Sequence, residues 1–167
     1  SGEITTTWQD GNNQLERRLF VSRPDDVIVM SISASEGVLP RCEIGLSDSG
    51  TGGEDEARDR EKYLLESNIS SEGDIIKFKG NYRNGGGYTG AARIITTGGT
   101  ISSDGTKLLI EDTTNILILA GVSPDPDIAV LTARLNGVSA DYETLFEKHK
   151  AEHGELFKRV SLDLDGG

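Results

Sequence analysis

Residues 15–33 read LERRLFVSRPDDVIVMSIS, and this stretch decides the fold class. Leu19 and Val21 are two residues apart and fall on one side of an extended chain. This period of two is typical of a half-buried strand. The turn-forming residues 23–26 (RPDD) end that strand. The nearly continuous apolar run that follows, 27–33, predicts a second strand, buried on both faces as in the middle of a β-sandwich.

Short strands and tight turns recur along most of the chain. Glycine accounts for 21 of 167 residues, well above the average of about 7%, and it supplies many of the turns. Strands that recur at roughly ten-residue spacing predict antiparallel sheets packed as a β-sandwich. The other predicted strands are 3–9, 38–46, 74–80, 91–97, 107–111 and 116–120.

Towards the C-terminal end the pattern changes from strands to helices. A short helix is predicted at 127–135 and a long one at 139–160, with Ser139 as the N-cap of the long helix. The long helix carries one apolar stripe at three- and four-residue spacing, which predicts a face that packs against a partner surface. The stripe residues are Tyr142, Leu145, Phe146, His149, His153, Leu156, Phe157 and Val160.

The predicted domain organisation follows from these changes of pattern. Residues 1–123 form a β-sandwich portion, and residues 124–167 form a helical segment. Within the first portion, residues 48–61 are polar, acidic and glycine-rich with almost nothing apolar. That composition predicts a flexible acidic surface loop.

The net charge argues against two classes of partner. Asp and Glu number 28 against 17 Lys and Arg, so the formal net charge is -11. A surface this acidic repels phosphate backbones and anionic lipid headgroups, so we expect no nucleic-acid partner and no membrane partner. The longest apolar run, 115–122, is far shorter than the ~20 residues of a membrane helix. No basic start with an apolar segment is found, so we expect a signal peptide to be either absent or already removed, and the compartment is not determined.

Few residue patterns point to metal, cofactor or nucleophile chemistry. His149 and His153 share a helix face and could hold one metal ion, but no third ligand is near in sequence, so packing is the favoured interpretation. Cys42 is the single cysteine and fits no zinc pattern. The Gly85–Gly87 run lies between strands, which favours a β-connection over a phosphate cradle. We therefore expect no metal and no cofactor.

Three aromatic residues, Trp8, Tyr82 and Tyr88, are the candidate carbohydrate contacts. Aromatic faces match the C–H faces of pyranose rings, so exposed rings could form a platform on which a sugar stacks. Core packing is the alternative, because one Trp, four Tyr and four Phe are all the aromatic residues of the chain.

Several short motifs, in order, resemble one enzyme family. Residues 17–29, RRLFVSRPDDVIV, resemble the R-E-x-F-x-S-x-P-D-x-V-I-V stretch of glycoside hydrolase family 95. The strand at 115–120 resembles that family's x-L-L-L-A strand, and Tyr142, Leu145 and His149 begin a passage like its closing Y-x-x-L-x-x-x-H. Further similar words are FKG at 78–80, GGGY at 85–88, GGTI at 98–101 and LFKRVSLDL at 156–164.

The resemblance implies a supersandwich-like domain from a larger enzyme. Family 95 contains α-L-fucosidases and some α-L-galactosidases, in which an N-terminal β-sandwich and helical linkers precede a catalytic (α/α)6 barrel. This sequence is similar to the later part of the sandwich and to the linker helix, and it has no match to the barrel. No catalytic residue is therefore carried over to any position here.

The expected function is accordingly that of a non-catalytic domain. The resemblance implies a glycoside hydrolase as the parent enzyme, with the barrel of the same polypeptide as partner and carbohydrate as its substrate. The stripe from Tyr142 to Phe157 is the expected interdomain contact. A free-standing carbohydrate-binding module is the alternative. The resemblance favours a secreted or periplasmic parent and does not exclude a cytoplasmic one.

Overall fold

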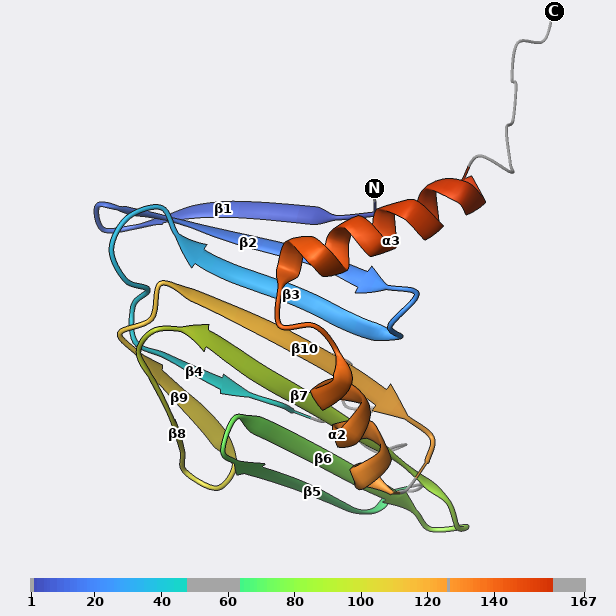
Figure 1. The fold of residues 1–167 in the computed structure, drawn as a ribbon. Coiled ribbons are helices and arrows are strands. Elements are labelled where there is room, and N and C mark those ends of the chain that lie inside the picture. The colour runs from blue at the N-terminus through green and yellow to red at the C-terminus, as the bar shows by residue number, and fades with distance from the viewer. Residues whose placement is uncertain (1, 48–63, 126, 158–167) are drawn as a thin grey trace, which may run out of the picture.

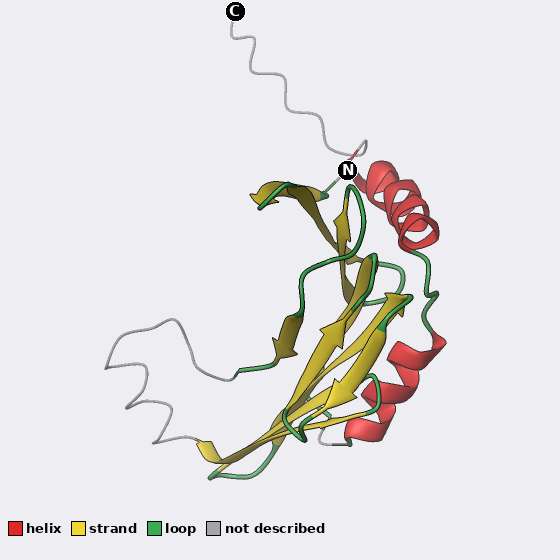
Figure 2. Ribbon diagram, turned by 90° about the vertical axis from the view of Figure 1, so that its left-hand side faces the viewer, coloured by secondary structure: helices red, strands yellow, loops and turns green. Residues whose placement is uncertain are grey.

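The structure, a computed structural model, describes residues 2–47, 64–125 and 127–157. In these residues the strands form a seven-stranded antiparallel sheet, called the large sheet, and a three-stranded antiparallel sheet, called the small sheet. Two helices pack on the face of the large sheet that points away from the small sheet (Figures 1 and 2). The prediction of a mainly β, antiparallel sandwich with C-terminal helices is confirmed.

The large sheet has the strand order β1-β2-β3-β10-β7-β6-β5. Neighbours in sequence pair as hairpins, and β10 enters between β3 and β7, so the centre of the sheet joins segments far apart in the chain. The strands are β1 (Ile4–Asp10), β2 (Asn13–Ser22), β3 (Val27–Ala34), β10 (Asn115–Ser123), β7 (Gly87–Thr97), β6 (Ile75–Tyr82) and β5 (Leu64–Glu72).

The small sheet has the order β4-β9-β8 and covers part of one face of the large sheet. Its strands are short: β4 (Cys42–Gly45), β9 (Lys107–Glu111) and β8 (Thr100–Ser103). The strand predicted at 38–46 is therefore confirmed only over β4. The residues before β4 form a loop in which Leu39 is buried and donates its backbone N–H to the Thr113 carbonyl at 2.7 Å.

Two cores result, one on each face of the large sheet. Between the two sheets, isoleucine and leucine side chains interdigitate, and Ile76, Ile94 and Leu108 have no exposed surface. This side is called the small-sheet face. On the opposite side, the helix face, Phe20, Val29 and Leu119 are buried against the helices. Each strand in the centre thus contributes alternate residues to two cores, which explains its nearly continuous apolar sequence.

The two helices are α2 (Ile128–Gly137) and α3 (Tyr142–Phe157). α2 packs on β7 and β10, and α3 packs on β2 and β3 (Figure 1). Asp127 caps α2 by accepting from the Ala129 N–H at 2.9 Å. Neither described helix is long and apolar enough to cross a membrane.

The start of α3 differs from the sequence prediction. Asp141, not Ser139, is the N-cap: its carboxylate accepts from the Thr144 N–H at 2.7 Å and its carbonyl from the Leu145 N–H at 3.2 Å. The Ser139 hydroxyl instead accepts from the Asp141 N–H at 3.2 Å, so it orders the turn before the helix. The acidic loop predicted at 48–61, and Val160 of the stripe, lie outside the described residues.

Candidate functional site: an apolar cleft on the open half of the sheet

The small sheet covers only one half of its face of the large sheet. On the other half, called the open half, Val21, Ile28 and Val122 are 61%, 38% and 65% exposed. Val21 is the cross-strand partner of Ile28, and Ile28 is the partner of Ala120, so these side chains form one continuous surface. A row of exposed aliphatic side chains on adjacent strands marks an interaction surface more often than scattered exposed residues do.

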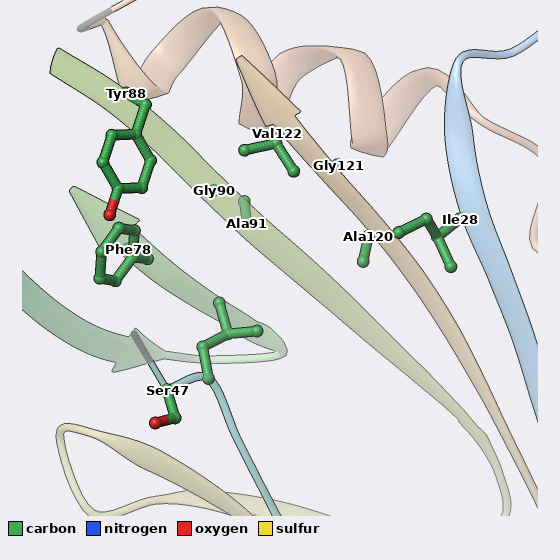
Figure 3. A pocket seen from close by; sticks show the side chains of 10 residues that line it. Ile28, Ser47, Phe78, Tyr88, Gly90, Ala91, Ala120, Gly121 and Val122 are labelled. Carbon is green, nitrogen blue, oxygen red and sulfur yellow. The ribbon is translucent and has the colours of Figure 1, made fainter. Parts of the chain in front are cut away.

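A cleft of about 470 Å³ lies at this open half. Figure 3 shows Tyr88 and Phe78 at one end of the cleft and Ile28 at the other end. Ser47 lies across the cleft from Gly121 and Val122. Almost all of its surface is apolar, and the described polar side chains that line it are hydroxyls. The lining residues are Ile28, Leu46, Ser47, Phe78, Tyr88, Gly90, Ala91, Ala120, Gly121 and Val122.

Small residues on the central strands create the floor of the cleft. Gly90 on β7 is the partner of Phe78 on one side and of Val122 on the other. A Cβ at Gly90 would meet no atom closer than the Gly121 carbonyl oxygen at 3.7 Å and Phe78 Cβ at 3.8 Å. A Cβ would therefore fit at Gly90 in ordinary van der Waals contact, so the backbone there forms a low floor for the cleft.

The aromatic rings at the end of the cleft form a short stack. Phe78 and Tyr88 have ring centroids 5.2 Å apart, and Tyr82 and Tyr88 have centroids 5.7 Å apart. The Tyr88 ring lies over Gly80, where an added Cβ would come within 2.8 Å of the ring. Gly80 thus fixes the ring against the sheet, and Tyr82 stays 40% exposed beside it.

Of the three predicted carbohydrate contacts, the structure brings two together. Tyr82 and Tyr88 are neighbours, whereas Trp8 lies on β1 at the opposite edge of the large sheet, with four strands between β1 and β6. Trp8 is 40% exposed and pairs with Leu15, so it is on the small-sheet face but far from the cleft. A platform of all three rings is therefore not formed.

The first half of the predicted α3 stripe is buried inside this domain. The Phe20 ring on β2 lies 5.3 Å from the rings of Tyr142 and Phe146 and 5.1 Å from that of His149. Leu145 is buried in the same core. These residues join α3 to its own sheet, and their contact with a second domain stays a prediction.

The second half of the stripe has less cover. The His153 ring stacks between those of His149 and Phe157, at centroid distances of 5.2 Å and 6.3 Å. Phe157 is 76% exposed, and Leu156 lies in α3 with its side chain outside the described part. A Cβ at Gly2 would lie 3.4 Å from His149 Nε2, so the middle of α3 lies beside the residues that precede β1.

Polar contacts clamp the first turn of α3 to the sheet. Glu3 Oε1 accepts from Arg18 Nε and from the Tyr142 hydroxyl, each at 2.8 Å. The Arg18 guanidinium lies 4.4 Å above the Tyr142 ring and also pairs with Glu143. Burial and the Glu3 carboxylate raise the pKa of Tyr142 well above its usual range, so its hydroxyl stays protonated and donates.

No metal centre is formed in the described part of the chain. Residues 2–47, 64–125 and 127–157 contain no group of three or more His, Cys, Asp or Glu side chains that could hold an ion. His149 and His153 stack on each other rather than converge on a common point. Burial raises the pKa of the Cys42 thiol, which favours the unreactive protonated form.

Sequence reasoning missed most of the cleft. The sequence predicts strands at Phe78 and Ile28 but ends the strand at residue 120, before Val122. The side of the sheet left open depends on which strands the small sheet covers, and that pairing is non-local. Gly90 precedes the predicted strand 91–97 and lies within β7 only in the structure, where a strand glycine often marks the close approach of a ligand or another backbone. The register of β6, β7 and β10 was needed to interpret it.

Comparisons with known proteins fit this architecture. A family model described as "Glycosyl hydrolase family 65, N-terminal domain" matches residues 1–126. No curated protein matches the chain. A solved structure named "Putative kojibiose phosphorylase from human microbiome" superposes with a TM-score of 0.60 and 9% identity, over 93% of this chain and 23% of that one. At this identity the likeness shows the fold, and the chain spans less than a quarter of that protein.

Proposed function

The chain belongs to the family of N-terminal domains of glycosyl hydrolase family 65, and from this premise we propose that it is a non-catalytic domain supporting the catalytic domain of a carbohydrate-active enzyme. The main support is the open half, where the strands of the large sheet continue beyond the small sheet and no other described residues form a second layer. The described residues that line the cleft offer hydroxyls and apolar surface, which suit docking rather than acid–base chemistry.

The proposed occupant of the open half is an apolar surface of the catalytic domain of the same polypeptide. Val21 lies at the end of β2 and Ile28 near the start of β3, close to the end of the sheet where β1 begins. We propose that a domain in contact with the exposed Phe157 also reaches the open half, which lies on the other face of the sheet. The rest of the α3 stripe, from Tyr142 to His149, would transmit that contact to the large sheet through Phe20.

A finer proposal concerns the chemistry of the parent enzyme. The motifs between Arg17 and Leu164 that are similar to glycoside hydrolase family 95 favour an α-L-fucosidase or α-L-galactosidase. A family 65 parent that resembles the solved structure would instead be expected to act by phosphorolysis on a disaccharide such as kojibiose.

The activity test compares the chain with an enzyme that contains it. Both are assayed on aryl α-L-fucoside, on aryl α-L-galactoside, and on kojibiose with inorganic phosphate. We expect turnover of one of these by the enzyme and none by the chain alone. Fucoside hydrolysis would support the finer proposal, kojibiose phosphorolysis would reject it, and turnover by the chain alone would reject the non-catalytic role.

The docking role is tested with two exposed valines. Val122→Asp places a carboxylate on the open half, and Val130→Asp places one on the outer side of α2, where Val130 is 56% exposed. In the isolated chain both variants should be as stable as the wild type, since both sites face water. In the whole enzyme Val122→Asp should lower Tm and activity while Val130→Asp should not. Equal effects of the two would contradict the docking role.

A second candidate function, a carbohydrate-binding module, has one observation in its favour. Tyr82 and Tyr88 are adjacent, and Tyr82 is exposed at the rim of the cleft. Titration of the chain with fucosylated oligosaccharides, followed by tyrosine fluorescence and calorimetry, should then show binding that Tyr82→Ala weakens. An absence of heat and of spectral change at millimolar ligand would discard this function.

A further inference from the structure

A row of polar side chains crosses the helix face beyond the cover of α2. Glu16 on β2 is the cross-strand partner of Ser33 on β3, Ser33 is the partner of Asn115 on β10, and Asn115 is the partner of Thr97 on β7. Directly opposite residues point to the same side of a sheet, so the four side chains form one line at roughly 5 Å intervals.

This row lies in a cavity of about 300 Å³. One wall is the start of α3, where Asp141, Tyr142 and Glu143 stand beside the sheet, and Leu117 contributes apolar floor. Because Arg18 is bound to Glu3 and Glu143 and packs on Tyr142, this wall is held in place before any ligand enters. The cavity is unconnected with the cleft, which lies on the other face of the sheet.

The row has unused hydrogen-bonding capacity. Ser31 is 8% exposed, and its Oγ accepts from Asn115 Nδ2 at 3.0 Å, which orients the Asn115 amide. Within the described part of the chain, the Asn115 Oδ1 atom, the Ser33 hydroxyl and the Glu16 carboxylate make no hydrogen bond. They offer two strong acceptors with a hydroxyl between them, on neighbouring strands.

The charge around the cavity selects against anions. Glu16, Asp141 and Glu143 face Arg18, whose guanidinium is already shared between Glu3 and Glu143. A phosphate or carboxylate would meet net negative charge, whereas a neutral molecule with several hydroxyl donors would not.

We propose that this cavity is a binding subsite for a neutral pyranose sugar, with Glu16, Ser33 and Asn115 as the hydrogen-bonding residues. The spacing of the row is similar to the separation of hydroxyls across a hexopyranose ring. No aromatic face is free for stacking, because the Tyr142 ring is covered by Arg18, so the affinity is millimolar. The subsite goes beyond the docking role proposed for the open half and does not depend on it.

The test is an NMR titration of the whole ¹⁵N-labelled chain. D-glucose and L-fucose are the neutral probes, glucose 6-phosphate is the anionic probe, and L-arginine methyl ester is the cationic probe. The readout is the side-chain amide of Asn115 together with the backbone amides of β2 and β3. We expect saturable shifts there with at least one neutral sugar and none with glucose 6-phosphate.

Matched variants separate the subsite from general effects. Ser33→Ala and Glu16→Gln each remove one contact without breaking a bond of the folded chain, and each should weaken sugar binding by about fivefold. Asn84→Ala, in the exposed turn between β6 and β7, should change nothing.

Three results would overturn the proposal. They are no saturable shift at Asn115 with either sugar, sugar shifts confined to Tyr82 and Tyr88, and shifts at Asn115 caused by the arginine ester but not by the sugars. The last would identify a pocket for a basic side chain.

Discussion

One face of strand β10 is covered by the small sheet along part of its length and is exposed along the rest. Ile116 and Val122 are on the same face of this strand, yet Ile116 is 1% exposed beneath the small sheet and Val122 is 65% exposed beyond it. Both are aliphatic and both pair with β7, but only Ile116 also has a partner on β3, because the pairing of β10 with β3 ends at Ala120. Val122 therefore lacks both the cover of the small sheet and a partner on β3.

The contrast shows that the large sheet is longer than its second layer. A strand with apolar residues along its whole length is expected where both halves are covered in the working protein. On the helix face, α2 and α3 provide such a cover over Phe20, Val29 and Leu119. On the small-sheet face the described residues provide it for one half only, which is why the other half is the candidate docking surface.

The largest expected effect separates the two halves directly. Leu108→Ala removes a fully buried side chain from the closed half and should lower the free energy of unfolding by about 2–5 kcal/mol. Val122→Ala, on the open half, should change it by less than about 0.5 kcal/mol. Urea unfolding followed by circular dichroism measures both. Similar losses for the two variants would mean that the open half is covered in the isolated chain.

Two glycines on neighbouring strands test the difference between the two faces of the large sheet. A Cβ at Gly121 would lie 3.0 Å from Leu131 Cδ1 and 3.1 Å from Arg134 Nη2, both on α2. Gly121→Val should therefore push α2 from the sheet and cost about 1–3 kcal/mol. Gly90→Val enters the cleft, where the nearest atom is 3.7 Å away, and should be neutral within about 0.5 kcal/mol in the isolated chain.

The same Gly90→Val protein serves a second measurement. In the whole enzyme it should weaken docking of the catalytic domain, because its side chain occupies the floor of the cleft. A stable Gly121→Val and an unstable Gly90→Val would reverse the assignment of the two faces.

The sequence predicted the strands whose residues alternate or are continuously apolar, and it failed where the pattern was weak. Residues 107–111 and the strands on both sides of the Arg23–Asp26 turn were correctly placed. β5 and β8 were not, since LLESNISSE and TISS carry too few apolar residues to show a period. Their pairing with β6 and β9 makes them strands, and that information is tertiary.

For the candidate site, the sequence identified individual side chains but not which other side chains lie beside them. Tyr82 and Tyr88 were correctly grouped because one hairpin turn brings them together. Trp8 was wrongly grouped, since β10 inserts between β3 and β7 and places β1 at the far edge. The α3 stripe is confirmed as a buried face from Tyr142 to His149, but spacing cannot distinguish a partner sheet in the same domain from a second domain.

The clamp at the start of α3 gives a smaller, pH-dependent effect. Tyr142→Phe removes the hydroxyl bonded to Glu3 and should cost about 1–2 kcal/mol at neutral pH. Burial and Glu3 raise the pKa of Tyr142, so above pH ~10 the unfolded chain loses the phenol proton while the folded chain keeps it. Wild-type stability should fall as pH rises through that window, and less steeply in Tyr142→Phe. Equal slopes for the two proteins would contradict the clamp.

The smallest expected effect concerns the helix that closes the other face. Asp141→Ala removes the N-cap of α3 and should lower Tm by about 2–4 °C, whereas Ser139→Ala should lower it less, because Ser139 orders only the preceding turn.

The hydrogen bonds from the Thr144 hydroxyl and N–H lower the pKa of Asp141, so the contribution of this N-cap to stability is present above pH ~4 and is lost as pH falls through the lowered pKa. Thermal unfolding at neutral and at acidic pH should therefore show the difference between Asp141→Ala and wild type shrinking in acid. A larger loss for Ser139→Ala would restore the cap that the sequence alone predicted. It would also mean that α3 begins two residues earlier, about half a helical turn.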